Sequence, residues 1–143
     1  MRTQQTRSIR IYASLALLVG AISGAGAPLH ASDDAASGGR LYVTHCSACH
    51  QVNGEGLPGV APPLKGSGVV NKDDASKHIH AVLDGISGGT AGGVVYPSAM
   101  PPFAGVLSDA EIADIIDFER SSWGNHGKPV TSAQVTAARS SSK

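Results

Sequence analysis

Cys46-Ser-Ala-Cys49-His50 is the stretch of sequence that decides the fold. Two cysteines and a histidine in a C-x-x-C-H pattern are typical of covalent haem attachment. Each cysteine sulfur adds to one vinyl group of the porphyrin, and the adjacent imidazole binds the iron. The motif therefore predicts one covalent haem c, with Cys46 and Cys49 as thioether anchors and His50 as the proximal iron ligand.

Two other interpretations of the cysteine pair are a redox-active dithiol and half of a zinc site. Both cysteines of the chain lie in the motif, so no second cysteine pair is present to complete a zinc site. A thioredoxin-like dithiol is expected beside a βαβ pattern, and the sequence around the motif has none. A random chain of this composition would contain the motif about once in a thousand times, which favours the haem interpretation.

The first thirty residues have the pattern of an export signal. Arg2, Arg7 and Arg10 precede an apolar run over residues 11–22. A run of this length is typical of a signal peptide and is short for a membrane span. We predict cleavage after Ala31 and a periplasmic location, with a retained membrane anchor as the alternative.

The length and charge of the chain after cleavage limit its number of domains and the kinds of partner it can bind. Residues 1–31 are the predicted signal peptide, 32–130 one haem-binding domain, and 131–143 a short helix and tail. The full chain has 11 basic and 11 acidic residues, and removal of the three arginines leaves eight basic residues. No basic patch is evident, so no nucleic-acid partner is expected. The low aromatic content of 4% with 18 glycines predicts a thin core that a buried haem would complete.

The hydrophobic pattern predicts helices joined by glycine- and proline-rich loops, with no alternation long enough to indicate a strand. We therefore expect an all-α fold with three core helices and a short C-terminal helix. The first helix is expected from near Asp34 to Cys46, with Leu41 and Tyr42 facing inward. It places the haem motif at its end.

The second helix is expected from residue 73 or 74 to about residue 84, with Gly85 as its C-terminal glycine. His78 and His80 lie about 100° to either side of Ile79, and we expect both to be solvated. The apolar stripe of this helix consists of Ala75, Ile79, Val82, Leu83 and Ile86.

Two capping boxes predict the remaining helices. Ser108-x-x-Glu111 begins the third helix, and Phe118 is expected to reach a neighbouring helix. Thr131-x-x-Gln134 begins the short fourth helix. The third helix continues at helical spacing with Ile112, Ile115, Ile116 and Glu119.

Met100 is the candidate for the second iron ligand. It is the one methionine besides Met1, and prolines on both sides stiffen its loop. A thioether favours ferrous iron, so His/Met ligation raises the reduction potential relative to two histidines. Five glycines between Gly85 and Gly93 precede this loop. They either allow positive-φ turns close to the haem or form a flexible linker.

With these motifs in this order, the sequence resembles a small class I monohaem cytochrome c over nearly the whole chain after the signal. The resemblance implies that the carbonyl of Pro62 accepts a hydrogen bond from the proximal His50. It also implies that Leu64 packs on the haem, and that Gly39 and Phe118 let the first and last core helices cross closely. The segment Trp123-Gly-Asn is similar to cytochromes found beside, or fused to, periplasmic and membrane oxidoreductases.

The resemblance implies electron transfer rather than catalysis. We expect a periplasmic single-electron carrier that contacts donor and acceptor proteins transiently, with Ala99, Pro101 and Pro102 in an apolar docking rim. One alternative is a non-diffusing haem subunit of a dehydrogenase or reductase complex. Another is a haem sensor or peroxidase in which Met100 leaves the iron, although neither His45 nor His126 has a spacing that indicates a catalytic base.

Overall fold

The computed structural model describes residues 31–142, with side chains from residue 36. The arginines and the apolar run of the predicted signal peptide lie outside the described residues. The helices are α1 (Ala31–His45), α2 (Ser47–His50), α3 (Ser76–Asp84), α4 (Asp109–Ser121) and α5 (Ser132–Ser141). The strands are β1 (Ile86–Ala91) and β2 (Val94–Met100). Among the described helices, none has the length and apolar character needed to cross a membrane.

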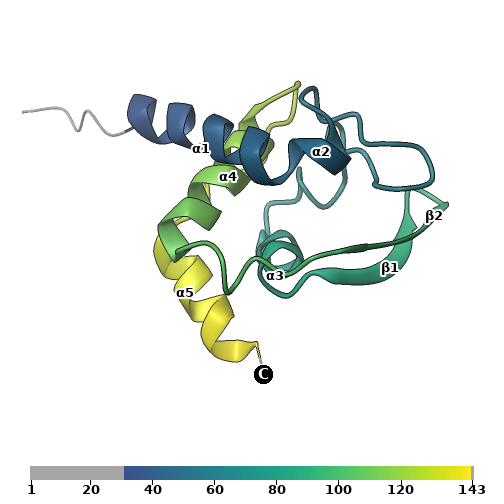
Figure 1. The fold of residues 1–143 in the computed structure, drawn as a ribbon. Coiled ribbons are helices and arrows are strands. Elements are labelled where there is room, and N and C mark those ends of the chain that lie inside the picture. Colours follow the sequence, from purple (N-terminus) through teal and green to yellow (C-terminus); the bar gives the residue numbers. More distant parts are fainter. Residues whose placement is uncertain (1–30, 143) are drawn as a thin grey trace, which may run out of the picture.

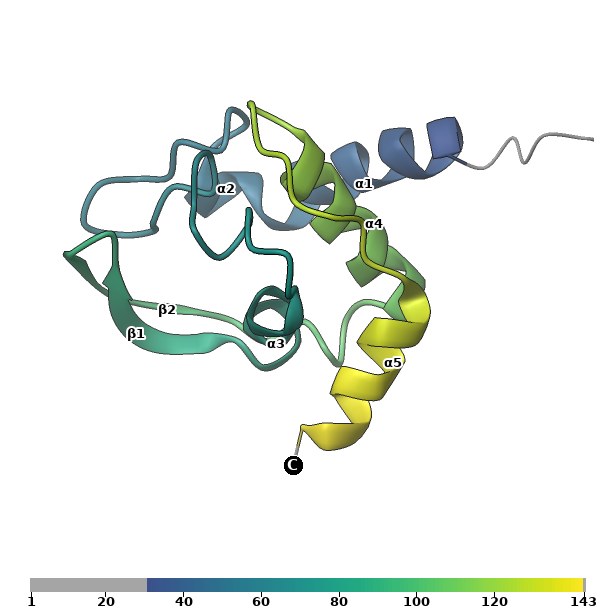
Figure 2. The same ribbon diagram turned by 180° about the vertical axis from the view of Figure 1, so that it is seen from behind.

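Helices α1 and α4 cross each other (Figures 1 and 2). They approach closely because α1 has two glycines at the contact. A Cβ atom on Gly38 would lie 2.1 Å from the backbone oxygen of Asp114. A Cβ atom on Gly39 would lie 3.2 Å from the ring of Phe118. Phe118 therefore reaches a neighbouring helix as predicted, and hydrogen in place of a side chain is required at the crossing.

Three aromatic rings close the end of this crossing. The ring centroids of Tyr42 and Phe118 are 5.3 Å apart, and those of Tyr42 and Trp123 are 5.1 Å apart. The hydroxyl of Tyr42 donates to the backbone carbonyl of Gln51 at 2.6 Å. Trp123 has a φ of 55° and packs directly against Gly54. The aromatic cluster thus fixes the chain that follows the haem motif against both helices.

The core between α3, α4 and α5 is the one that the hydrophobic pattern predicts. Both predicted capping boxes are present, at Ser108 with Glu111 and at Thr131 with Gln134. Gly85 ends α3 with a φ of 72°. The buried members include Ala75, Ile79, Val82, Leu83, Ile112, Ile115, Ile116, Val130 and Val135.

The prediction is wrong for one residue of the apolar stripe, Ile86. Ile86 is the first residue of β1 and is 45% exposed, because Gly85 ends the helix before the stripe reaches it. Strands β1 and β2 then form an antiparallel hairpin that extends away from the helices (Figure 1). Gly92 and Gly93, with φ values of 57° and 81°, form its turn.

The hydrophobic pattern predicts no strand in this segment and allows a flexible linker, whereas the structure has a hairpin there. A two-residue Gly-Gly turn is a hairpin signal, and Val94, Val95 and Tyr96 are good strand residues. The strands lack an alternating pattern because most of their side chains are exposed on both faces. The helical core is unchanged by this addition.

Helix α5 is held to α4 by polar contacts as well as by Val135. The guanidinium Nε of Arg139 donates to the carboxylate of Asp109 at 2.6 Å. The same guanidinium also donates to the backbone carbonyls of Ala104 and Leu107. One arginine therefore connects α5, the start of α4 and the segment that follows Met100.

Candidate functional site

All six residues proposed for the site from the sequence line one cavity of about 300 Å³. The lining is mainly apolar, as is usual for a cofactor site. Its walls come from the end of α1, from α2, from the segment 60–70, from α3 and α4, and from the hairpin. The proposed site residues in this lining are Cys46, Cys49, His50, Pro62, Leu64 and Met100.

Helix α2 places His50 at the cavity wall with one ring nitrogen bonded. The side chain is buried, and its Nδ1 lies 2.9 Å from the backbone oxygen of Pro62. A carbonyl oxygen can only accept, so Nδ1 carries the proton and Nε2 keeps its lone pair. Such a bond fixes the orientation of a ligand imidazole and makes it more basic.

Asn125 holds the loop that presents Pro62 and Leu64. Its side-chain oxygen accepts from the backbone N–H of Gly66 at 2.8 Å and from the amide of Asn71 at 2.9 Å. Its side-chain nitrogen donates to the backbone carbonyls of Leu64 and Glu119, at 3.1 Å and 2.8 Å. A buried amide with four partners ties this cavity wall to the end of α4. The sequence pattern does not predict this structural role of Asn125. The one local feature that could have pointed to it is its position directly after Trp123-Gly.

Gly85 and the C-terminal end of α3 position Met100 at the other side of the cavity. A Cβ atom on Gly85 would lie 2.5 Å from the backbone oxygen of Met100, so this close approach requires glycine. After Met100, the backbone N–H of Phe103 donates to the carbonyl of Val82 at 3.0 Å. The glycines therefore serve the first of the two predicted roles at this position, a positive-φ turn beside the ligand loop.

The environment of the cysteines fits thioether anchors better than either alternative. Cys46 is half-buried, and burial, together with the charge of Glu119, raises the pKa of its thiol to about 12. A reactive dithiol requires a lowered thiol pKa. Among the described residues, no three His, Cys, Asp or Glu side chains are placed to hold a metal ion. The two thiols, the free Nε2 of His50 and the thioether of Met100 together fit the donor chemistry of haem c.

The structure contradicts the prediction that His78 is solvated. Its side chain is 5% exposed, and its Nε2 donates to Glu119, itself 3% exposed, at 2.7 Å. Both residues line the cavity. The helical spacing placed His78 correctly at the flank of α3, but α4 and the cavity cover that flank. His80, on the opposite flank, is 40% exposed and donates to Asp84 at 2.8 Å.

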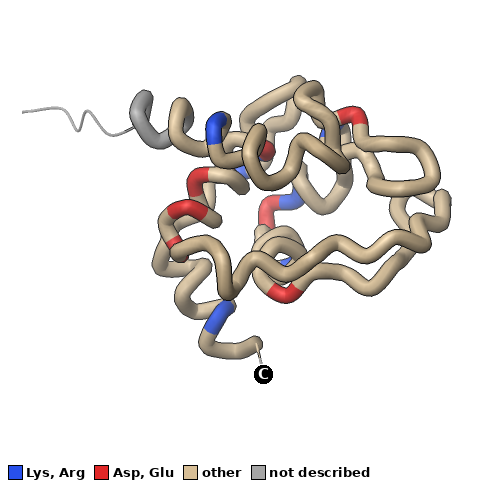
Figure 3. Tube along the Cα trace, viewed as in Figure 1, with Lys and Arg blue, Asp and Glu red and all other residues tan. Residues whose placement is uncertain are grey.

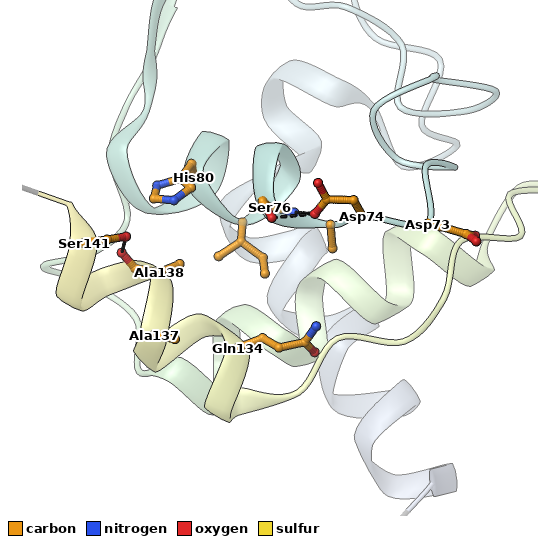
Figure 4. Close-up of a pocket in the computed structure, with 10 residues that line it drawn as sticks. Asp73, Asp74, Ser76, His80, Gln134, Ala137, Ala138 and Ser141 are labelled. Atoms are coloured by element: carbon orange, nitrogen blue, oxygen red, sulfur yellow. Dashed lines mark hydrogen bonds between the residues drawn. The ribbon is translucent and has the colours of Figure 1, made fainter.

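A second cavity, of about 390 Å³, lies between α3 and α5 (Figure 4). It is lined by short or polar side chains, including Gln134, His80 and Asp74, whose carboxylate accepts from Ser76. No residue proposed for the site lies there, and its lining provides neither a thiol nor a thioether. The set of side chains that fits haem c therefore lines the first cavity and not the second.

Charge is absent from the hairpin that borders the haem cavity. Residues 86–100 contain no Lys, Arg, Asp or Glu, and the tube in Figure 3 is uncoloured along this stretch. Exposed Val60, Val69 and Ile86 add apolar surface to the cavity lining. Pro101 and Pro102, proposed for the docking rim, are exposed beside Met100.

Comparison with known proteins agrees with this geometry. The gluconate 2-dehydrogenase cytochrome c subunit of Pantoea cypripedii is 39% identical over 113 residues, which are 74% of this chain and 24% of that protein. The alcohol dehydrogenase (quinone) cytochrome c subunit of Gluconobacter oxydans is 35% identical over 68% of this chain and 20% of that protein. This chain thus spans a quarter or less of those two subunits.

Cytochrome c-552 of Thermus thermophilus is similar over most of its length: 34% identical over 113 residues, which are 73% of this chain and 85% of that protein. The family model for cytochrome c matches residues 35–123. That range contains the haem motif, Pro62, Leu64 and Met100. The chain therefore belongs to the cytochrome c family, whose members carry covalently bound haem c.

Proposed function

We propose that the chain is an exported single-electron carrier with one covalently attached haem c. The observation that supports this most strongly is the convergence of two thiols, one imidazole with a free Nε2 and one thioether on a single apolar cavity. When bound, haem supplies a one-electron ferric/ferrous couple. Cys46 and Cys49 would anchor it, and His50 and Met100 would bind the iron.

The protein's own residues hold these ligands rigidly. The Pro62 carbonyl fixes the ring of His50, Asn125 fixes the loop that contains Pro62 and Leu64, and Gly85 fixes the approach of Met100. A redox centre with rigid ligands changes little on electron transfer. The apolar surface beside Met100 suits brief contacts with donor and acceptor proteins.

A second candidate function is that of a non-diffusing haem subunit in an oxidoreductase complex. It is favoured by the similarity to proteins described as cytochrome c subunits of gluconate and alcohol dehydrogenases. Helix α5, which follows the segment matched by the family model, would then provide surface for the partner. The identity of any dehydrogenase partner is not implied by this similarity, because the chain spans only a small part of those proteins.

The test is a native periplasmic extract separated by size exclusion and followed by haem absorption. A carrier is expected to elute at the size of the single chain and to be reduced and reoxidised by soluble redox mediators. Elution with a larger complex that has dehydrogenase activity would support the subunit function instead. Rapid binding of carbon monoxide to the ferrous protein near neutral pH would contradict a filled sixth position and favour a sensor or peroxidase.

A further inference from the structure

The buried pair His78–Glu119 has no role in the attachment or ligation described above. It joins α3 to α4 across 2.7 Å, and both side chains line the haem cavity. Ionisable side chains are rarely buried this deeply unless they are paired. An apolar contact at the same place would bring α3 and α4 together without the desolvation that an ion pair requires. The pair therefore calls for an explanation beyond packing.

The second ring nitrogen of His78 is the informative atom. Nε2 donates to the carboxylate of Glu119, whereas Nδ1 is buried and has no hydrogen-bond partner among the residues that the structure describes. With a proton on Nε2 alone, the imidazole is neutral and Nδ1 has a free lone pair that can accept a proton. Protonation of Nδ1 would give an imidazolium paired with a carboxylate. The pair can therefore exist in two states that differ by one proton and one unit of charge.

We propose that the His78–Glu119 pair is a redox-linked proton-binding site that takes up a proton at Nδ1 of His78 when the haem is reduced. The inference rests on the proposed function, because it requires haem in the cavity that both residues line. Reduction brings one electron from a donor protein and makes the charge in the cavity more negative by one. Uptake of one proton from water onto Nδ1 offsets that charge, and reoxidation releases both. Charges interact strongly in a poorly solvated interior, so the two events are coupled.

Two ionisable groups near the pair, Tyr42 and Cys46, are poor candidates for the same role. Burial and the charge of Glu119 raise the pKa values of both Tyr42 and Cys46, so neither ionises near neutral pH. The sulfur of Cys46 no longer titrates once it is a thioether. The further ionisable residues that line the cavity are His45, Cys49, His50 and Tyr96, and α5 contributes none.

The chain offers a matched control on the same helix. His80 is also paired with a carboxylate, Asp84, at 2.8 Å, but these side chains are 40% and 42% exposed. Neither His80 nor Asp84 lines the haem cavity. Replacing His80 therefore removes a histidine–carboxylate contact of similar length from α3 without changing the lining of the cavity.

The experiment measures the midpoint potential of the haem-loaded protein between pH 5 and 9 for the wild type, His78→Gln and His80→Gln. The wild type is expected to show a potential that falls as the pH rises, with a slope of up to about 59 mV per pH unit, the value for one proton per electron. His78→Gln should lose this slope, and His80→Gln should keep it. Equal slopes in the wild type and His78→Gln would overturn the proposal, as would a wild-type potential independent of pH.

Proton uptake, a second variant and the haem content provide further tests of the proposal. Proton uptake on reduction, followed with an indicator dye in weakly buffered solution, should approach one proton per electron in the wild type and fall in His78→Gln. If His78→Gln does not fold, Glu119→Gln keeps a hydrogen-bonding side chain at α4 and should shift the pH range of the slope. Covalent haem content is measured first. Absent haem would contradict the proposed function, whereas retained haem with no proton uptake would contradict this inference alone.

Discussion

The helix crossing, formed by α1 and α4 around Gly38 and Phe118, differs in kind from the loop and hairpin side of the cavity, residues 60–70 and 86–100, which we call the cavity wall below. The crossing is filled by its own side chains, and Tyr42 is fully buried there against the ring of Phe118. The cavity wall instead exposes apolar side chains, with Val60 at 38%, Val69 at 43% and Ile86 at 45%. The helix crossing is packed by protein side chains alone, whereas the cavity wall leaves room for a large apolar group.

The difference shows where stability comes from in this chain. Burial of apolar surface contributes roughly 25 cal/mol per Å², and the crossing obtains it without a ligand. The cavity wall relies instead on hydrogen bonds from a distant segment, such as those of Asn125, and leaves apolar surface uncovered. A ligand that binds only the folded state adds stability. We therefore expect haem to stabilise the cavity wall far more than the crossing.

The largest expected effect comes from removing both haem anchors. In Cys46→Ala/Cys49→Ala, haem is expected to be lost, because no covalent link remains. Amide hydrogen exchange should then show loss of protection in residues 54–71, while residues 114–118 of α4, which face Gly38 and Gly39 at the crossing, remain protected for longer. Equal protection of both regions in the haem-free protein would break the distinction between them.

Met100→Ala tests whether the cavity wall supplies the second iron ligand. Loss of the thioether should lower the reduction potential by on the order of 100 mV, because axial ligands set the potential of haem proteins. Carbon monoxide should also bind the ferrous protein rapidly. Val95→Ala is the control, since this side chain lies on the same hairpin and is 68% exposed. An unchanged potential in potentiometric titration of Met100→Ala would exclude Met100 as the ligand.

Gly38→Ala tests the helix crossing. Alanine normally favours a helix over glycine, but here its Cβ would lie 2.1 Å from the backbone oxygen of Asp114. We expect a loss of about 1–3 kcal/mol in the free energy of unfolding, measured by denaturant titration. Gly105→Ala, where no atom of the described residues other than those of its chain neighbours lies within 4 Å of the added Cβ, should change it by less than about 0.5 kcal/mol. Similar effects of the two substitutions would contradict the close crossing.

The smallest effect is expected at the contact between α4 and α5. Hydrogen bonds from Thr136 and Arg139 lower the pKa of Asp109 below its ordinary value of 3.8. A lowered carboxyl pKa adds stability above the unfolded-state pKa, and this stability is lost as the pH falls through the folded-state pKa. Asp109→Asn should therefore lower the melting temperature at pH 7, with a difference from the wild type that shrinks below about pH 4. A difference that is constant with pH would show that the charge of Asp109 has no part in it.

Local signals in the sequence predicted the helices well. The capping boxes at Ser108 and Thr131 define their own helix starts through contacts three residues apart, and Gly85 ends α3 through its own φ angle. The haem motif is likewise local, and its spacing specifies chemistry. All six proposed site residues line the same cavity, although their roles in haem binding stay predictions.

Features that depend on distant segments could not be predicted in this way. The burial of His78 depends on Glu119, 41 residues away, and helical spacing alone says nothing about which neighbour covers a flank. Asn125 acquires its role mainly from three partners that are 54 to 61 residues away. The hairpin was missed for a different reason, since its exposed strands lack the alternation that burial of one face produces.

Covalent haem held by Cys46 and Cys49 and ligated by His50 and Met100 is the central claim, and absorption spectroscopy tests it most directly. The exported protein is recorded oxidised, then reduced with dithionite, and again after acid–acetone extraction. We predict that haem stays with the polypeptide, with sharp bands in the reduced form and a weak near-infrared band of methionine-bound ferric iron. Haem that extracts or is absent would contradict covalent attachment, and retained haem without the near-infrared band would contradict ligation by Met100.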